Sequence, residues 1–235
     1  MRRLRFLIVL TVAAAILPRT EASAQQPTSN VHLHLVFPGN AKRPAPPAVV
    51  WLKPLQPMPE LQFPPHKTYT LLQKNRTFIP HLLVVPVATE VFFPNADPFF
   101  HNVFSLFDGK RFDLGLYEAG STKGVTFSRE GVSYIFCNIH PEMSAVVVAL
   151  TTPLYAIADS AGVIDIHSAP EGEYELHTWV EGVPQPILDR LTHRVHIGPN
   201  GGDLGLINVP IAPLLTTAHT NKFGQPYDKD SKPTY

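Results

Sequence analysis

Residues 134–143 of the chain read Tyr-Ile-Phe-Cys-Asn-Ile-His-Pro-Glu-Met. An alternating strand pattern leads into this stretch, and the apolar run 145–150, typical of a buried strand, follows it. The thiol of Cys137, the imidazole of His140 and the thioether of Met143 therefore lie within seven residues, on a tight loop between two strands. Side chains at this spacing can converge on one point, which makes the loop a candidate metal site.

A second imidazole precedes this loop, in the sequence Phe-Phe-His-Asn-Val at 99–103. Two His, one Cys and a weakly bound Met form the ligand set of blue-copper electron-transfer sites. Thiolate and thioether ligands favour Cu(I), whereas imidazole also suits Cu(II). A site built from this mixture accepts both oxidation states with little rearrangement, so the pattern favours one-electron copper chemistry.

The loop resembles the copper loop of the cupredoxins, in particular the short amicyanin-type loop, and 101–103 resembles the upstream ligand motif of the same family. The resemblance implies a Greek-key β-sandwich over residues 61–150. It implies one type 1 copper ion with four ligands, His101, Cys137, His140 and Met143. Asn102 would lie outside the ligand set and help to tie the two ligand loops together. Asn138 and Ile139 replace the usual Thr-Pro of the family, which leaves the redox potential open.

Three alternative interpretations of the same residues stay open. A lone Cys near a His is often an inert buried thiol. The pair could also act as nucleophile and base, although neither an orienting acid nor an oxyanion hole can be assigned. Zinc could use the same ligands, but structural zinc sites seldom include Met. We favour copper and expect no enzymatic activity.

Composition limits the remaining possibilities. The chain has 235 residues, with 19 basic and 19 acidic side chains and one Cys. This length allows one large or two small domains. A neutral charge balance argues against nucleic acid as a partner. The single Cys excludes an internal disulfide framework and any CxxC-type site.

Residues 1–24 have the pattern of a cleaved secretory signal peptide. Three Arg stand within the first five residues, the apolar run 6–17 follows, and the segment ends on Ala-Ser-Ala. The apolar run has 12 residues, which is short for a membrane span, and an uncleaved anchor is the alternative. Cleavage would leave 15 basic and 18 acidic side chains. The sequence thus predicts a mildly acidic, periplasmic or secreted protein without stable membrane insertion, and an unpaired thiol there is a liability unless a metal protects it.

The mature chain is predicted to be all-β, with two sandwiches. Short alternating runs are separated by Pro-Gly, Asp-Gly and Asn-Gly turns. The chain has 25 Pro, which makes long helices improbable. Residues 28–60 hold N-terminal strands and a Pro-rich connector. Residues 213–235 form a polar tail that we expect to run over the surface or fray.

Residues 151–212 resemble the carboxypeptidase regulatory-like, or transthyretin-like, β-sandwich. An Asp-Ser-Ala-Gly turn at 159–162 precedes one strand, and Pro-Glu-Gly-Glu-Tyr at 170–174 opens the next. Residues 28–55 resemble the opening strands of the same fold, which favours a discontinuous sandwich with the copper domain inserted. The alternative is an N-terminal arm followed by two consecutive domains. We expect this sandwich to act as a scaffold or docking unit.

We expect a monomer that shuttles single electrons between periplasmic redox proteins, with a cytochrome c or a dehydrogenase as the partner. His140, with Pro141 beside it, would form the docking surface. Two alternatives are a copper carrier without redox shuttling and an interaction module with a structural metal. His32 and His34 share one face of a strand, so a second metal site is possible. The six Phe within 92–107 are either sandwich core or a dry collar around the site.

Overall fold

The computed structural model describes residues 28–39, 44–65, 68–106, 109–210 and 220–227. The predicted signal peptide lies outside these residues. Within them the chain forms 17 strands and one short helix, α1 (Gln185–Leu191), so the all-β prediction is confirmed. No helix in these ranges is long and apolar enough to cross a membrane.

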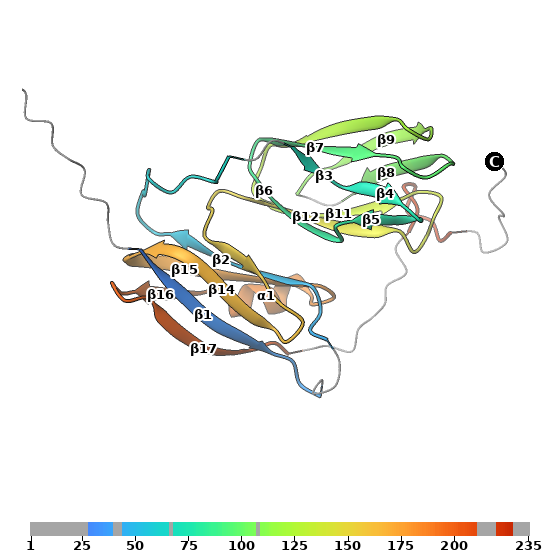
Figure 1. Ribbon diagram of the computed structural model, residues 1–235. Helices are drawn as coiled ribbons and strands as arrows, with labels where there is room; N and C mark the ends of the chain where they lie inside the picture. The colour runs from blue at the N-terminus through green and yellow to red at the C-terminus, as the bar shows by residue number, and fades with distance from the viewer. Residues whose placement is uncertain (1–27, 40–43, 66–67, 107–108, 211–219, 228–235) are drawn as a thin grey trace, which may run out of the picture.

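The candidate metal ligands belong to a sandwich of two sheets and one hairpin (Figure 1). The larger sheet has the order β6-β12-β11-β8-β9, formed by Leu82–Pro86, Ser144–Leu150, Gly131–Cys137, His101–Ser105 and Phe112–Tyr117. The smaller sheet has the order β10-β7-β3, formed by Thr122–Phe127, Thr89–Pro94 and Tyr69–Thr70. A two-stranded hairpin consists of β4 (Leu72–Lys74) and β5 (Thr77–Ile79). Phe93, Val103, Phe127 and Ile135 fill the core between the sheets, and each is at most 1% exposed.

The second sandwich combines strands from both ends of the described chain. One of its sheets has the order β14-β1-β17, formed by Val163–Pro170, Thr28–Val36 and Gly202–Asn208. The other has the order β13-β2-β15-β16, formed by Tyr155–Ile157, Ala48–Pro54, Gly172–Val180 and His193–Ile197. The chain therefore leaves this sandwich after β2 and returns to it at β13. Between this departure and the return it builds the sandwich that carries the candidate ligands.

The two sandwiches share a packed boundary, and strand β12 lies at it. Val146 and Val148 of β12 belong to the core of the second sandwich. Ala145 and Val147 belong to the core of the sandwich that holds the candidate ligands. Because alternate residues of a strand point to opposite faces, both faces of β12 are buried. This double burial explains why the run 145–150 is apolar throughout instead of alternating.

Polar contacts also join the two sandwiches. The Trp179 indole N–H of β15 donates to the Tyr134 hydroxyl of β11 at 3.2 Å. Next to β6, the two ring nitrogens of His81 lie 2.7 Å from a Glu181 carboxylate oxygen and 3.1 Å from the Ser144 carbonyl oxygen. Both partners are acceptors, so His81 can satisfy both only as the imidazolium. The second sandwich thus supports β11 and β12, the two strands that flank the candidate metal loop.

We expect the His81–Glu181 link to stabilise the protein at mildly acidic pH and to weaken as pH rises. The Glu181 hydrogen bond, which outweighs the opposing effect of burial, raises the pKa of His81 above its ordinary 6.5. A pKa raised in the folded state stabilises fully below the ordinary value, and this gain is lost as pH rises through the raised value. The His81 side chain is 40% exposed, so the gain is about 0.5 kcal/mol. Urea unfolding of the wild type and of His81→Gln at pH 5.5 and 8.5 measures this gain in the free energy of unfolding.

Glu181→Gln should lose the same pH-dependent stability, because it removes the other partner of the same pair. A stability difference between wild type and His81→Gln that grows toward alkaline pH would contradict this assignment.

Candidate metal centre

Three of the residues predicted to bind copper converge in the structure. The donor atoms of His101, Cys137 and His140 lie within 4.8 Å of one another, and all three side chains are buried. The Cys137 Sγ is 3.6 Å from the His101 Nδ1 and 3.4 Å from the His140 Nδ1. An ordinary metal–nitrogen bond and metal–sulfur bond add up to about 4.3 Å. Both separations are shorter than this sum, so a single ion fits between the donors.

Backbone hydrogen bonds place these ligands. Cys137 ends β11, which pairs with β8, the strand that begins at His101. The Cys137 N–H donates to the Met143 carbonyl at 3.1 Å, and the Met143 N–H donates to the His140 carbonyl at 3.0 Å, so the loop is closed by its own backbone. The Asn138 N–H donates to the Asn102 carbonyl at 2.9 Å. This last bond ties the loop directly to the strand that supplies the other imidazole.

Met143 and Asn102 are both buried, and the backbone carbonyl of each accepts a hydrogen bond from the Cys137 loop. Met143 is fully buried in the same core cluster as Cys137. Asn102 ties the ligand loops through its backbone carbonyl, while its side-chain amide donates to the Asp113 carboxylate at 2.6 Å. The backbone N–H of Asn102 also forms a hydrogen bond with the Cys137 sulfur. This bond lowers the pKa of the thiol and so opposes the rise that burial causes.

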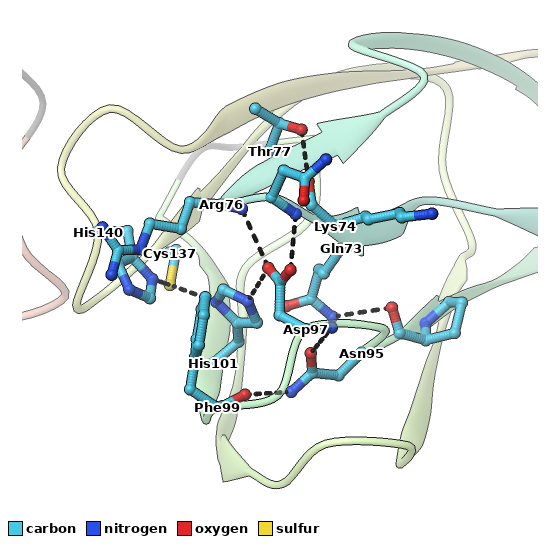
Figure 2. A network of polar contacts seen from close by, with 12 residues as sticks. Gln73, Lys74, Arg76, Thr77, Asn95, Asp97, Phe99, His101, Cys137 and His140 are labelled. Atoms are coloured by element: carbon cyan, nitrogen blue, oxygen red, sulfur yellow. Dashed lines mark hydrogen bonds and ion pairs between the residues drawn. The ribbon is translucent and has the colours of Figure 1, made fainter. Parts of the chain in front are cut away.

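Asp97 is a residue of the site that the sequence analysis missed. The His101 Nε2–H donates to the Asp97 carboxylate at 2.9 Å, and Asp97 is 4% exposed (Figure 2). Two backbone N–H groups donate to the same carboxylate, from Asn75 at 2.6 Å and Arg76 at 3.0 Å. These two residues form the turn of the β4–β5 hairpin and have φ of 54° and 56°, as a type I′ turn requires.

The carboxylate fixes which nitrogen of the neighbouring imidazole carries the proton. Burial alone would raise the pKa of Asp97, but hydrogen bonds from Arg76, His101 and Asn75 outweigh it and hold the pKa below its ordinary value. Burial lowers the pKa of His101 and outweighs the opposing effect of Asp97. The pair is therefore a carboxylate with a neutral imidazole. Because Nε2 carries the proton that Asp97 accepts, the Nδ1 lone pair faces Cys137 and is free to bind a metal.

The other two donors are also uncharged before a metal binds. Burial, followed by the nearby His101 and Arg76, lowers the pKa of His140 to about 4. Burial raises the pKa of the Cys137 thiol, although backbone N–H groups at the sulfur oppose the shift. A cluster of neutral imidazoles beside a protonated thiol is suited to a cation that displaces the thiol proton on binding.

The Phe99 ring packs against both imidazoles of the site. The Phe99 ring lies 5.3 Å from the His101 ring and 5.6 Å from the His140 ring, and the Arg76 guanidinium stacks 5.2 Å from the Phe99 centroid. Of the six Phe considered above, Phe99 therefore forms the collar, whereas Phe93 and Phe104 are buried core. Phe107 lies outside the described residues.

His140 differs from the expectation drawn from the family resemblance. It is 3% exposed, and its Nε2 is buried without a hydrogen-bond partner among the described residues. The Phe99 ring lies beside its ring, which accounts for part of this burial. Pro141 is exposed, so the surface above the site is formed by the neighbours of His140 and not by the imidazole itself.

The other histidines make separate contacts. His32 pairs with Asp165 on the neighbouring strand, and the His34 Nε2 lies 2.8 Å from the Ala161 carbonyl oxygen. Within the described ranges, the site at Cys137 is the single group of three His, Cys or acidic side chains whose donor atoms converge. A second metal site therefore has no preformed ligand set there.

Comparison with known proteins gave partial structural similarities. No protein-family model and no curated protein matches the chain. A purple cupredoxin from Nitrosopumilus maritimus is 26% identical over 34% of this chain and 96% of its own, with a TM-score of 0.31. Amicyanin from Paracoccus versutus is 19% identical over 37% of this chain and 84% of its own, with a TM-score of 0.33. A copper-containing nitrite reductase from Thermus scotoductus is 22% identical over 42% of this chain and 25% of its own, with a TM-score of 0.35.

Proposed function

We propose that the protein is a cupredoxin-like type 1 copper protein that carries single electrons. The observation that carries this proposal is the convergence of buried Cys137, His101 and His140 at separations that fit one ion. Met143, buried in the same core, would be the weak fourth ligand. Thiolate, two imidazoles and a thioether are the ligand set of blue-copper sites, and structural zinc sites use Cys and His instead of Met.

Copper would supply the one-electron redox chemistry, and the chain's own residues would prepare its site. Asp97 holds the His101 ring with Nδ1 toward Cys137, so that this ligand is oriented in advance. The bonds from Cys137 to Met143 and from Asn138 to Asn102 fix the loop. The Phe99 ring packs against the two imidazoles and would help to keep water from them. A site that is rigid and dry changes little when its metal changes charge, which keeps the barrier to electron transfer low.

The pattern of residues 1–24 supports export to the periplasm, where a monomeric carrier would exchange electrons with a cytochrome c or a dehydrogenase. Because His140 is 3% exposed, we expect such a partner to approach over Phe99 and exposed Pro141. The protein would carry out no bond-making chemistry of its own.

A second candidate function is copper binding or delivery without redox shuttling. The burial of the His140 imidazole favours it, because the ring edge that would pass the electron to a partner is covered. Reversible exchange of electrons with a soluble cytochrome c would decide for the carrier, and failure of the copper-loaded protein to cycle would decide for delivery.

Addition of Cu(II) to the metal-free protein tests the proposed function. We expect binding of one copper ion and an intense visible absorption that disappears on reduction and returns on reoxidation. The absorption arises from charge transfer between thiolate and Cu(II), so protein loaded with Zn(II) should be colourless and serves as the control. Protein that holds one equivalent of Cu(II) and stays colourless would rule out a type 1 site.

A further inference from the structure

The C-terminal residues 220–227 fold against the candidate metal centre. Asn221 organises the segment as a tight turn, because its side-chain oxygen accepts the N–H groups of Phe223 and Gln225 at 2.9 and 3.0 Å. Figure 1 shows this short red segment beside the sandwich that holds the candidate ligands, far from the sandwich that contains β17, the strand before it. The polar tail expected to run over the surface or fray therefore has a defined place in this part of the chain.

One anchor of the segment is made directly to the ligand Cys137. The Tyr227 hydroxyl donates to the Cys137 carbonyl oxygen at 2.8 Å. Burial and the neighbouring Cys137 raise the pKa of Tyr227 above its ordinary 10, so the phenol keeps its proton and remains a donor. The hydrogen bond restrains the peptide that leads out of β11 into the metal loop.

A second anchor links the segment to the metal loop and to strand β9. The Lys222 backbone N–H donates to the Asn138 side-chain oxygen at 2.9 Å, and its ammonium group donates to the Asp113 carboxylate at 2.8 Å. Asp113 in turn accepts the Asn102 side-chain amide at 2.6 Å, and the Asn102 carbonyl accepts the Asn138 N–H at 2.9 Å. These four bonds form a closed ring through Lys222, Asn138, Asn102 and Asp113. The ring joins the residue after Cys137 to the residue after His101.

We propose that residues 220–227 are a structural part of the metal centre, in which Tyr227 and Lys222 are positioning residues that hold Cys137 and His101 in their ligating arrangement. The ligating role rests on the proposed copper function, whereas the restraint on Cys137 does not require a metal. Both anchors are long-range contacts: Lys222 and Asn138 are 84 positions apart in the chain, and Tyr227 and Cys137 are 90 positions apart. Loosening either anchor should expose Cys137 and change the metal's environment.

The reactivity of Cys137 in the metal-free full-length protein tests the restraint. Cys137 is the single Cys of the chain and is fully buried, so a thiol reagent reports on this residue alone. We expect Tyr227→Phe to accelerate the reaction about fivefold, the factor that corresponds to loss of one hydrogen bond. Lys222→Met should act similarly, since it removes the ion pair with Asp113. Gln225→Ala is the matched control, because this exposed residue contributes only backbone bonds, and it should react as wild type does.

Spectroscopy of the copper-loaded variants tests the ligating role. Tyr227→Phe and Lys222→Met should shift the visible absorption band and lose copper to a chelator several-fold faster, whereas Gln225→Ala should do neither. Tyr174→Phe, which removes a hydrogen bond from a tyrosine hydroxyl to the Pro170 carbonyl within the second sandwich, controls for general destabilisation and should leave the band in place. Equal thiol reactivity in wild type, Tyr227→Phe and Lys222→Met would overturn the proposal, whether or not the wild type is coloured. A colourless copper-loaded wild type with faster thiol reaction in the variants would instead overturn only the proposed function.

Discussion

Cys137→Ala is expected to abolish the visible absorption of the copper-loaded protein. The colour of a type 1 site comes from the thiolate, and the chain has no second Cys that could replace it. Removal of an outer residue around a metal site typically weakens binding about 10–100-fold, so removal of this ligand should weaken Cu(II) binding by more than that. Absorption spectra and competition with a chelator measure both effects.

The fold of the metal-free variant should survive this substitution. Cys137 is fully buried, but the change to Ala removes one sulfur atom and leaves a small cavity that costs about 1 kcal/mol. Met143→Leu is the matched control, because it removes the weak fourth ligand from the same loop and keeps an apolar side chain of similar size. We expect Met143→Leu to remain coloured and to have a changed reduction potential. Colour that persists in Cys137→Ala, or that is lost equally in Met143→Leu, would contradict the ligand assignment.

The convergence of the candidate ligands was predictable because it depends on short spacing and on neighbouring strands. Cys137 and His140 are three residues apart on one loop, so a tight turn brings them together whatever surrounds it. His101 required one more step, the pairing of β8 with β11, which follows once both segments are recognised as strands of one sheet. The all-β fold followed in the same way from the alternation of apolar residues and the turns between them.

The supports of the site depend on contacts between distant segments, and local patterns do not encode them. Asp97 stands four residues before His101, which was the one available signal, but its role arises because the turn at 75–76 lies against it. Tyr227 belongs to a polar tail that has no strand pattern, and it contacts Cys137 across 90 positions of the chain. The burial of His140 likewise depends on where the Phe99 side chain is placed. Spacing thus predicts which side chains can converge on one point, whereas tertiary packing decides how they are oriented and covered.

Asp97→Asn is expected to raise the reduction potential of the copper site and to weaken Cu(II) binding. The buried carboxylate carries a negative charge and accepts the His101 Nε2–H, and both effects favour the more highly charged oxidised metal. An amide has no net charge, so Cu(II) should lose more than Cu(I). Each tenfold difference between these two losses raises a one-electron potential by about 59 mV. With a loss of about 10–100-fold for Cu(II), voltammetry should record a rise of up to roughly 120 mV.

The same substitution should also destabilise the metal-free protein, because the amide has one acceptor oxygen for the three donors that now reach Asp97. Leaving a buried N–H without an acceptor costs about 1–3 kcal/mol, which urea unfolding can measure. Glu142→Gln is the matched control, since it removes one negative charge from an exposed residue next to Met143 without breaking a bond to a ligand. If Glu142→Gln and Asp97→Asn changed the reduction potential equally, the loss of one negative charge near the site would account for the effect. The hydrogen bond to His101 would then have no special role. A rise confined to Asp97→Asn would mean that the hydrogen bond from His101 to this buried carboxylate tunes the potential of the copper site.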